Sequence, residues 1–161
     1  MFEADHTKKR MEIFYREEMN NYLSNIRLAN NADQALKTVG HALLWACALM
    51  EFHEKNAPDD YKQFCERDGA KGVIAGVRYA RNRVLHQFIQ LLHVTEGAAF
   101  PWIFPVPFFE IRWLAFSELP PADLGHEHRG KAEAYKLHLE NVPVRSTLIA
   151  LEAFFSRFNA V

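Results

Sequence analysis

Apolar residues recur at spacings of three and four along four long segments of the chain, which places them on one face of an α-helix. The first segment runs from about Lys8 to Ala29, and the second runs from Ala35 to about His53. The third covers about Ala70 to Val94, and the last covers about Pro143 to Phe158. This spacing is the strongest constraint on the fold, because it predicts a mainly α-helical protein.

The second of these segments is apolar nearly all the way round at its middle. One side carries Leu36, Val39, Leu43, Ala46 and Met50, and the other side adds Leu44, Trp45 and Cys47. A helix of this kind is buried by neighbours on several sides. We therefore expect it to be the central helix, followed by a short helical turn around Tyr61 to Arg67.

The third segment carries a stripe of small residues, Gly72, Gly76 and Ala80, at four-residue spacing. A helix face without large side chains lets another backbone come close. We favour a tight helix crossing inside the bundle as the cause, with a contact between subunits as the alternative.

The region between the third and last segments differs in composition, because residues 96–141 hold five of the seven prolines. Phe109 to Phe116 is typical of a strand, and Tyr135 to Glu140 alternates apolar and polar residues. We expect these two to pair as a β-hairpin linked by Pro120 to Lys131. The predicted fold is one domain, residues 1–161, built as a four-helix up-down bundle, with a hairpin and aromatic insertion over residues 95–141.

Length and charge restrict the class of protein. The 161 residues suit a single domain with a real core, and the formal net charge is -1. A general nucleic-acid binder would show a strongly basic surface, so this charge argues against one. Any polyanion must therefore be bound locally.

Three further features indicate a cytoplasmic protein. The apolar runs Ala42 to Met50 and Ala98 to Phe109 are well short of the roughly 20 residues that span a bilayer. The first residues lack the layout of a secretion signal. Cys47 and Cys65 form no CxxC pair or disulfide framework, so we expect two reduced thiols. Because the apolar runs are short, we also expect no membrane association.

The chemistry with the clearest sequence signal lies in the third segment. From Gly69 to Thr95 the chain has no acidic residue, and its charged side chains are Lys71, Arg78, Arg81 and Arg83. Arginine binds phosphate oxygens through a planar fork, and histidine titrates near neutral pH. We therefore expect these arginines to lack local neutralising partners and to act on phosphodiesters together with His86.

Arg81 and His86 do not share a face of a straight helix, because the five residues from one to the other turn the helix by about 500°, which leaves the two side chains about 140° apart. Arg81 falls on the core stripe with Val77, so its guanidinium needs a buried partner, an exposed path or an anion. His86 shares a face with Tyr79, Asn82 and His93, a mixture that suits a neighbouring protein surface. If that neighbour is the same helix of a second subunit, two copies of Arg81 and His86 converge in one cleft.

The motif Arg81-Asn82-x3-His86, on the third helix of a predicted four-helix bundle, resembles the HEPN superfamily. Many of its members are metal-independent ribonucleases whose site forms at a dimer interface from Arg-x4-6-His motifs. The resemblance covers the four helices, about two thirds of the chain, and leaves out the aromatic hairpin region. The motif is short, so its specificity comes mainly from Asn82 and the helix context.

The resemblance implies a role for each motif residue. Arg81 would stabilise charge on the scissile phosphate, and His86 would move protons between the ribose 2′-hydroxyl and the leaving oxygen. Asn82 would orient the imidazole or bond the phosphate. The nearby side chains that would bind substrate are Arg78, Tyr79, Arg83 and His93.

The same resemblance implies the partners. RNA would be the substrate, a homodimer through the third helix would complete the site, and an antitoxin protein would accompany a toxin or defence role. No metal or cofactor is required. The alternative is a non-catalytic helical protein that uses the same face to bind a protein partner, nucleic acid or a small ligand.

Other candidate sites give weaker signals. His126-Glu127-His128 could ligate a metal but has no third ligand at a telling distance. Glu51 and Lys55 lie four apart, which favours a solvent-exposed ion pair. Glu-x3-Lys patterns occur in some members of the HEPN superfamily, so the resemblance leaves a supporting role as the alternative. Cys65 would need a nearby base to be a nucleophile, and the sequence supplies none.

Overall fold

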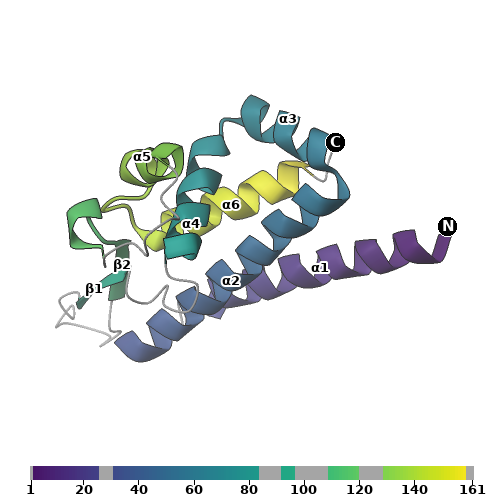
Figure 1. Ribbon diagram of the computed structural model, residues 1–161. Helices are drawn as coiled ribbons and strands as arrows, with labels where there is room; N and C mark the ends of the chain where they lie inside the picture. The colour runs from purple at the N-terminus through teal and green to yellow at the C-terminus, as the bar shows by residue number, and fades with distance from the viewer. Residues whose placement is uncertain (1, 26–30, 84–91, 97–108, 120–128, 159–161) are drawn as a thin grey trace.

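The computed structural model describes residues 2–25, 31–83, 92–96, 109–119 and 129–158. Within these ranges the chain forms six α-helices and one two-stranded antiparallel sheet, which confirms a mainly α-helical fold. The sheet lies at the opposite end of the molecule from the start of the first helix and the end of the last (Figure 1).

Two long helices form an antiparallel pair, α1 over Phe2–Asn25 and α2 over Ala32–Asn56 (Figure 1). Asn31 caps α2, because its side chain accepts a hydrogen bond of 2.8 Å from the backbone N–H of Gln34. Both helices were predicted. α1 begins earlier than expected, and the last residues of the predicted first helix, 26–29, lie outside the described ranges.

The central position predicted for α2 is confirmed. α2 packs against α1 and against the strands β1 (Leu92–Glu96) and β2 (Phe109–Trp113). It also packs against three further helices, α3 (Pro58–Asp68), α4 (Lys71–Arg83) and α6 (Val144–Phe158). Its buried residues include Val39, Leu43, Ala46, Cys47 and Met50. The apolar circumference read from the sequence therefore corresponds to neighbours on several sides.

The chain turns sharply between α3 (Pro58–Asp68) and α4 (Lys71–Arg83). Gly69 adopts a φ of 77°, a left-handed conformation that glycine reaches without steric cost. α3 contains the predicted turn at 61–67 and is longer than expected. The orientation that α4 takes from this turn brings its arginines to α2.

The predicted third helix was wrong at its C-terminal end. Leu92–Glu96 is strand β1 and not the last turn of a helix, while residues 84–91 lie outside the described ranges. Val94 and Thr95 are β-branched residues that fit a pleated strand, and Val94 pairs with Ile111 in the ladder. Helical spacing within this segment did not reveal a partner strand that lies further along the chain.

The small-residue stripe of α4 lies against α5 (Arg129–His138). A Cβ atom at Gly76 would lie 2.6 Å from Leu139 Cδ1 and 3.3 Å from the carbonyl oxygen of Ala134. A Cβ atom at Gly72 would overlap the imidazole of His138. The predicted close crossing is thus confirmed, and it lies within one chain.

The sheet pairs different strands from those expected. β2 confirms the first part of the predicted strand at 109–116, and its partner is β1 in antiparallel register. The predicted strand Tyr135–Glu140 was wrong, because this stretch belongs to the end of α5 and the turn that follows. Ala132, Tyr135 and Leu139 are buried at helical spacing, whereas Leu137 is 77% exposed, so the alternation did not report two faces of a sheet.

The last helix, α6 (Val144–Phe158), supplies much of the core, as predicted. Leu148, Leu151 and Phe155 are fully buried, and Phe158 is partly buried. Trp113 of β2 is also fully buried, and its indole Nε1–H donates a hydrogen bond of 3.0 Å to Thr147 Oγ1 of α6. None of the helices in the described ranges combines the length and apolar character that crossing a membrane requires.

Candidate functional site

Two arginines of the predicted site lie one helical turn apart on α4 and both are bound by carboxylates of α2. Arg78 donates from Nη1 and Nη2 to the two carboxylate oxygens of Glu54, at 3.0 Å and 2.8 Å. Arg81 forms an ion pair through Nη1 with Glu51. Glu51 and Glu54 are likewise one turn apart, so the two pairs form a ladder between antiparallel helices.

This ladder corrects one expectation. Arg78 and Arg81 were predicted to lack neutralising partners because the third segment contains no acid, and that prediction was wrong. The acids come from α2, and Glu54 lies 24 residues before Arg78 in the sequence. A charge count within a sequence window cannot detect an acid that packing brings from another helix.

The ladder lies at the edge of the core rather than within it. The side chains of Arg78 and Arg81 are 20% and 29% exposed, and those of Glu54 and Glu51 are 56% and 57% exposed. The arginines are therefore largely covered along their stems, while the carboxylates face solvent. The sequence left three possibilities open for the Arg81 guanidinium. The structure shows the second, because the stem of Arg81 follows the core stripe while its guanidinium reaches the surface and pairs with Glu51.

Glu51 pairs across helices and not along its own helix. The predicted ion pair with Lys55 is absent from the described part of the chain, since Glu51 bonds Arg81 instead. The alternative, a supporting role that the HEPN resemblance implies for the Glu51-x3-Lys55 pattern, stays a prediction.

Tyr79, predicted to bind substrate, lies in the core. It is 2% exposed, and its ring packs at centroid distances of 6.1 Å from Phe116 and 5.6 Å from Tyr135. A ring covered on both sides has no free face on which a base could stack. Tyr79 therefore fixes α4 against α5 and the segment after β2.

His93, also predicted to bind substrate, is exposed on strand β1 and not on the third helix. It lies opposite Arg112 of β2 in the two-stranded sheet. The guanidinium of Arg112 bonds both carboxylate oxygens of Glu110, at 2.8 Å and 3.1 Å, and donates to the carbonyl oxygen of Asn141 at 2.7 Å. His93 thus shares no helix face with Asn82.

The remaining motif residues are only partly described. Asn82 and Arg83 belong to the last turn of α4, where the backbone alone is described. His86 lies outside the described residues, as does the candidate metal segment His126-Glu127-His128. The structure therefore brings together Arg78, Arg81 and their two carboxylates. The meeting of Arg81 with His86 stays a prediction.

Both cysteines are buried free thiols, as predicted. Burial raises the pKa of Cys47 to about 11, although the charges of Arg81 and Arg78 act in the opposite direction. Burial also raises the pKa of Cys65. Neither thiol is ionised at neutral pH, which disfavours Cys65 as a nucleophile.

A pocket of about 380 Å³ borders the ladder on its α3 side. Arg78 and Glu54 line it together with Cys65 of α3 and Lys71 at the start of α4. Among the described residues, no group of three or more His, Cys, Asp or Glu side chains is arranged to hold a metal ion. No sequence pattern indicated this pocket, because its wall comes from four helices, α2 to α5.

Comparison with known protein families, curated proteins and solved structures finds no match to the chain. The likeness to the HEPN superfamily therefore depends on the motif residues and their helix context.

Proposed function

We propose that the chain is a metal-independent endoribonuclease of the HEPN type. In this proposal α1, α2, α4 and α6 correspond to the four helices of the up-down bundle. Two copies meet through the α4 region to form a homodimer, and the composite cleft holds Arg81, Asn82 and His86 of both copies.

The observation that carries the proposal is the position of Arg81. It lies in the last turns of α4, is 29% exposed, and is bound by Glu51 of α2. A guanidinium has five N–H donors, and one carboxylate accepts at most two of them. Glu51 thus orients Arg81, whose partly exposed guanidinium lies at the edge of the core, where the proposal puts the phosphate.

The chemistry follows from these groups. The ribose 2′-oxygen attacks phosphorus, and its proton passes to one His86, which acts as general base. The bond to the 5′-oxygen breaks, and that oxygen takes a proton from the second His86. Arg81 stabilises the negative charge on the phosphate oxygens, and the products are a 2′,3′-cyclic phosphate and a 5′-hydroxyl.

The test is cleavage of RNA by the purified protein in the presence of a chelator. We expect His86→Ala to lower the rate by at least about a hundredfold, the usual contribution of a positioned acid or base. His6→Ala, which changes an exposed histidine of α1, serves as the matched control. Melting temperatures of both variants establish that they fold.

Two results would overturn the proposal. One is a wild-type protein that leaves RNA intact, and the other is a folded His86→Ala variant that cuts as fast as wild type. Mass in solution adds an independent check, because a strict monomer cannot build a cleft from two copies.

A second function is favoured by the same ladder. Glu51 and Glu54 offset the charges of Arg81 and Arg78, so this face carries less positive charge than the sequence suggests. A non-catalytic helical protein that binds a protein partner through this face fits such a neutralised surface. Absence of cleavage together with retained assembly would favour this second function.

A further inference from the structure

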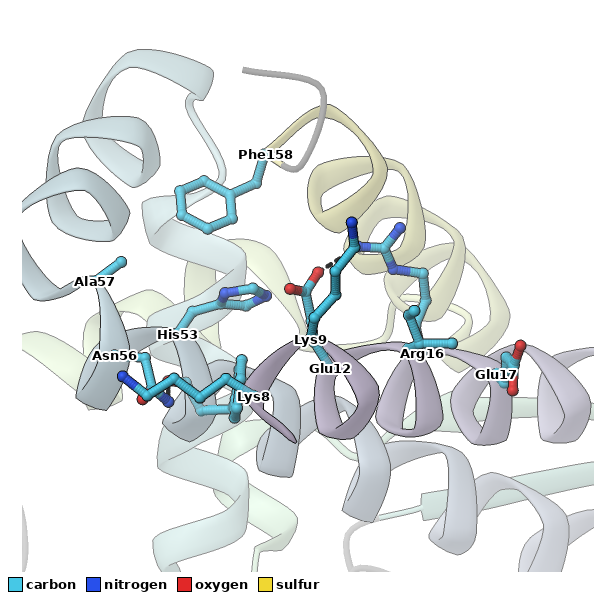
Figure 2. Close-up of a pocket in the computed structure, with 11 residues that line it drawn as sticks. Lys8, Lys9, Glu12, Arg16, Glu17, His53, Asn56, Ala57 and Phe158 are labelled. Atoms are coloured by element: carbon cyan, nitrogen blue, oxygen red, sulfur yellow. Dashed lines mark hydrogen bonds and ion pairs between the residues drawn. The ribbon is translucent and has the colours of Figure 1, made fainter. Parts of the chain in front are cut away.

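A second pocket, of about 740 Å³, lies on the side of α2 that faces α1. The N-terminal half of α1, the C-terminal end of α2 and Phe158 of α6 enclose it (Figure 2). Its lining combines charged and aromatic side chains, chiefly Lys8, Lys9, Arg16, Phe52, His53 and Phe158. Its size and mixed lining are those of small-molecule sites.

His53 provides an unmet hydrogen bond at this pocket. Only 4% of the residue is exposed, and its Nε2 atom is buried without a partner in the described structure. The ring is held by Phe158, at a centroid distance of 4.8 Å, and points from α2 toward α1 (Figure 2). A buried polar atom without a partner costs stability, so it calls for a functional or structural explanation.

Arg16 provides a second unmet donor at the same pocket. Its Nη2 donates to Glu12 Oε1 at 2.8 Å, whereas its Nε–H is buried and has no partner in the part of the chain that the structure describes. His53 and Arg16 come from different helices and line one cavity. Two helices therefore each bring one buried polar atom that a ligand in this cavity could bind.

The charges around the pocket leave one positive charge in excess. Lys8, Lys9 and Arg16 oppose Glu12 and Glu17, and Arg16 is paired with Glu12. Burial lowers the pKa of His53, an effect that the charge of Glu12 opposes and that of Arg16 reinforces. His53 is thus neutral near pH 7 and can donate from Nε2 without adding charge.

We propose that this pocket binds a small organic acid. The anionic head group accepts hydrogen bonds from Arg16 Nε–H and His53 Nε2–H, and a lysine side chain at the mouth adds attraction. The apolar body, about the size of a fused ring pair, packs on Phe52 and Phe158. The site shares no residue with the Arg81 ladder, so it does not depend on the ribonuclease proposal.

The head group is a carboxylate or a phosphate, which share the required chemistry of an anionic acceptor. The probes are 1-naphthoate, 1-naphthyl phosphate and the uncharged 1-naphthalenemethanol, titrated into the full chain by calorimetry. We expect saturable binding of at least one anion with one site per chain. The alcohol should bind at least about tenfold more weakly, because it cannot form the charge-assisted bonds.

His53→Phe tests the site without disturbing the fold. Phenylalanine keeps the ring contacts and removes the unpaired nitrogen, so the variant should be as stable as wild type or more stable. We expect it to weaken anion binding about tenfold or more and to leave binding of the alcohol unchanged. Arg16→Gln should show the same selective loss.

Lys37→Gln is the matched control for charge, because Lys37 is exposed on α2 and does not line the pocket. This variant should bind the anions as wild type does. The proposal is overturned if neither anion binds, if the alcohol binds as tightly, or if folded His53→Phe retains full affinity. The last result would mean that the two orphaned atoms have only a structural or solvent-filled role.

Discussion

The C-terminal half of α2 has two charged sides that differ in how their hydrogen bonds are met. On the side facing α4, Glu51 and Glu54 each bind one arginine, and the two pairs match turn for turn. On the side facing α1, His53 Nε2 and Arg16 Nε have no hydrogen-bond partner among the described residues, and cations exceed acids around an open pocket. One side is closed by the chain itself, and the other is left for a ligand.

This difference shows that the number of cations in a segment does not determine where an anion binds. The third segment is rich in arginine and free of acid in the sequence, yet α2 supplies its counter-charges. The start of α1 mixes lysine with glutamate and looks like an ordinary solvated face. Packing against His53 gives that face an unmet bonding capacity, which is what a ligand can use.

The largest expected effect comes from a substitution that disturbs the packing of α4 and leaves the pocket on the α1 side of α2 unchanged. Gly76→Val should lower the free energy of unfolding by about 2–3 kcal/mol, because its side chain would overlap Leu139 and approach the backbone of α5. Urea unfolding measures this loss. The affinity of the folded variant for 1-naphthoate should stay that of wild type, since the pocket is on the other side of α2.

Gly40→Ala is the control for this substitution. Gly40 lies within α2 and has nothing within 4 Å of the position of a Cβ atom, so alanine should add about 0.5–1 kcal/mol through helix propensity. Equal stability of Gly76→Val and wild type would contradict the close crossing. A parallel loss of naphthoate affinity would contradict the independence of the two sides.

A smaller effect, on RNA affinity, is expected when the carboxylates of the ladder are neutralised. The double variant Glu51→Gln and Glu54→Gln removes both counter-charges, so Arg78 and Arg81 can bind phosphates more strongly than in wild type. Affinity for single-stranded RNA at low salt should rise about tenfold, and the salt slope should steepen by about 0.7 for each new contact.

The matched control for the ladder is the double variant Glu133→Gln and Glu152→Gln, which makes the same charge change at an exposed glutamate of α5 and a half-buried glutamate of α6, both outside the ladder. Fluorescence anisotropy with a labelled RNA oligonucleotide compares the two. A rise of equal size in both variants would show that net charge, and not the ladder, controls RNA binding.

The smallest effect concerns the pH dependence of stability at the pocket side. Burial lowers the pKa of His53 in the folded chain below the unfolded value of about 6.5, so the unfolded chain binds the proton more tightly. This contribution to stability is complete above that pH and is lost as pH falls through the lowered pKa. Denaturant unfolding between pH 7.5 and 5 should therefore show a shallower decline in His53→Phe than in wild type.

Identical pH profiles for the two chains would contradict this assignment of His53. The comparison between wild type and His53→Phe removes the contributions of the other histidines, which are common to both. The direction of the pH effect also distinguishes a neutral buried His53 from a charged one. A histidine stabilised in its charged form would make the free energy of unfolding of the wild type rise, relative to His53→Phe, as the pH falls.

The sequence predicted the elements whose spacing is local. The apolar stripes of α1, α2 and α6 depend on neighbours three and four residues apart, and the small stripe of α4 predicted its close crossing. α5 was missed because Tyr135, Leu137 and Leu139 also alternate with period two. Burial of Ala132, which lies outside that short window, decides between the two patterns.

The candidate site was predicted only in part, because its contacts join distant residues. Arg81 was identified from its motif, but no sequence pattern indicated that Glu54 of α2 would bind Arg78 of α4. The pocket at His53 was missed for the same reason, since its walls come from α1, α2 and α6. Local patterns encode helices, whereas pairing between helices depends on the turn angles and packing that follow.

The central claim, RNA cleavage by attack of a 2′-hydroxyl without metal, is tested most directly with a pair of oligonucleotides in the presence of a chelator. One is all RNA, and the other has the same sequence with 2′-deoxyribose at every position. We predict that the protein cuts the first, leaving 2′,3′-cyclic phosphate ends, and does not cut the second. Intact RNA after prolonged incubation, or equal cutting of both, would contradict the claim.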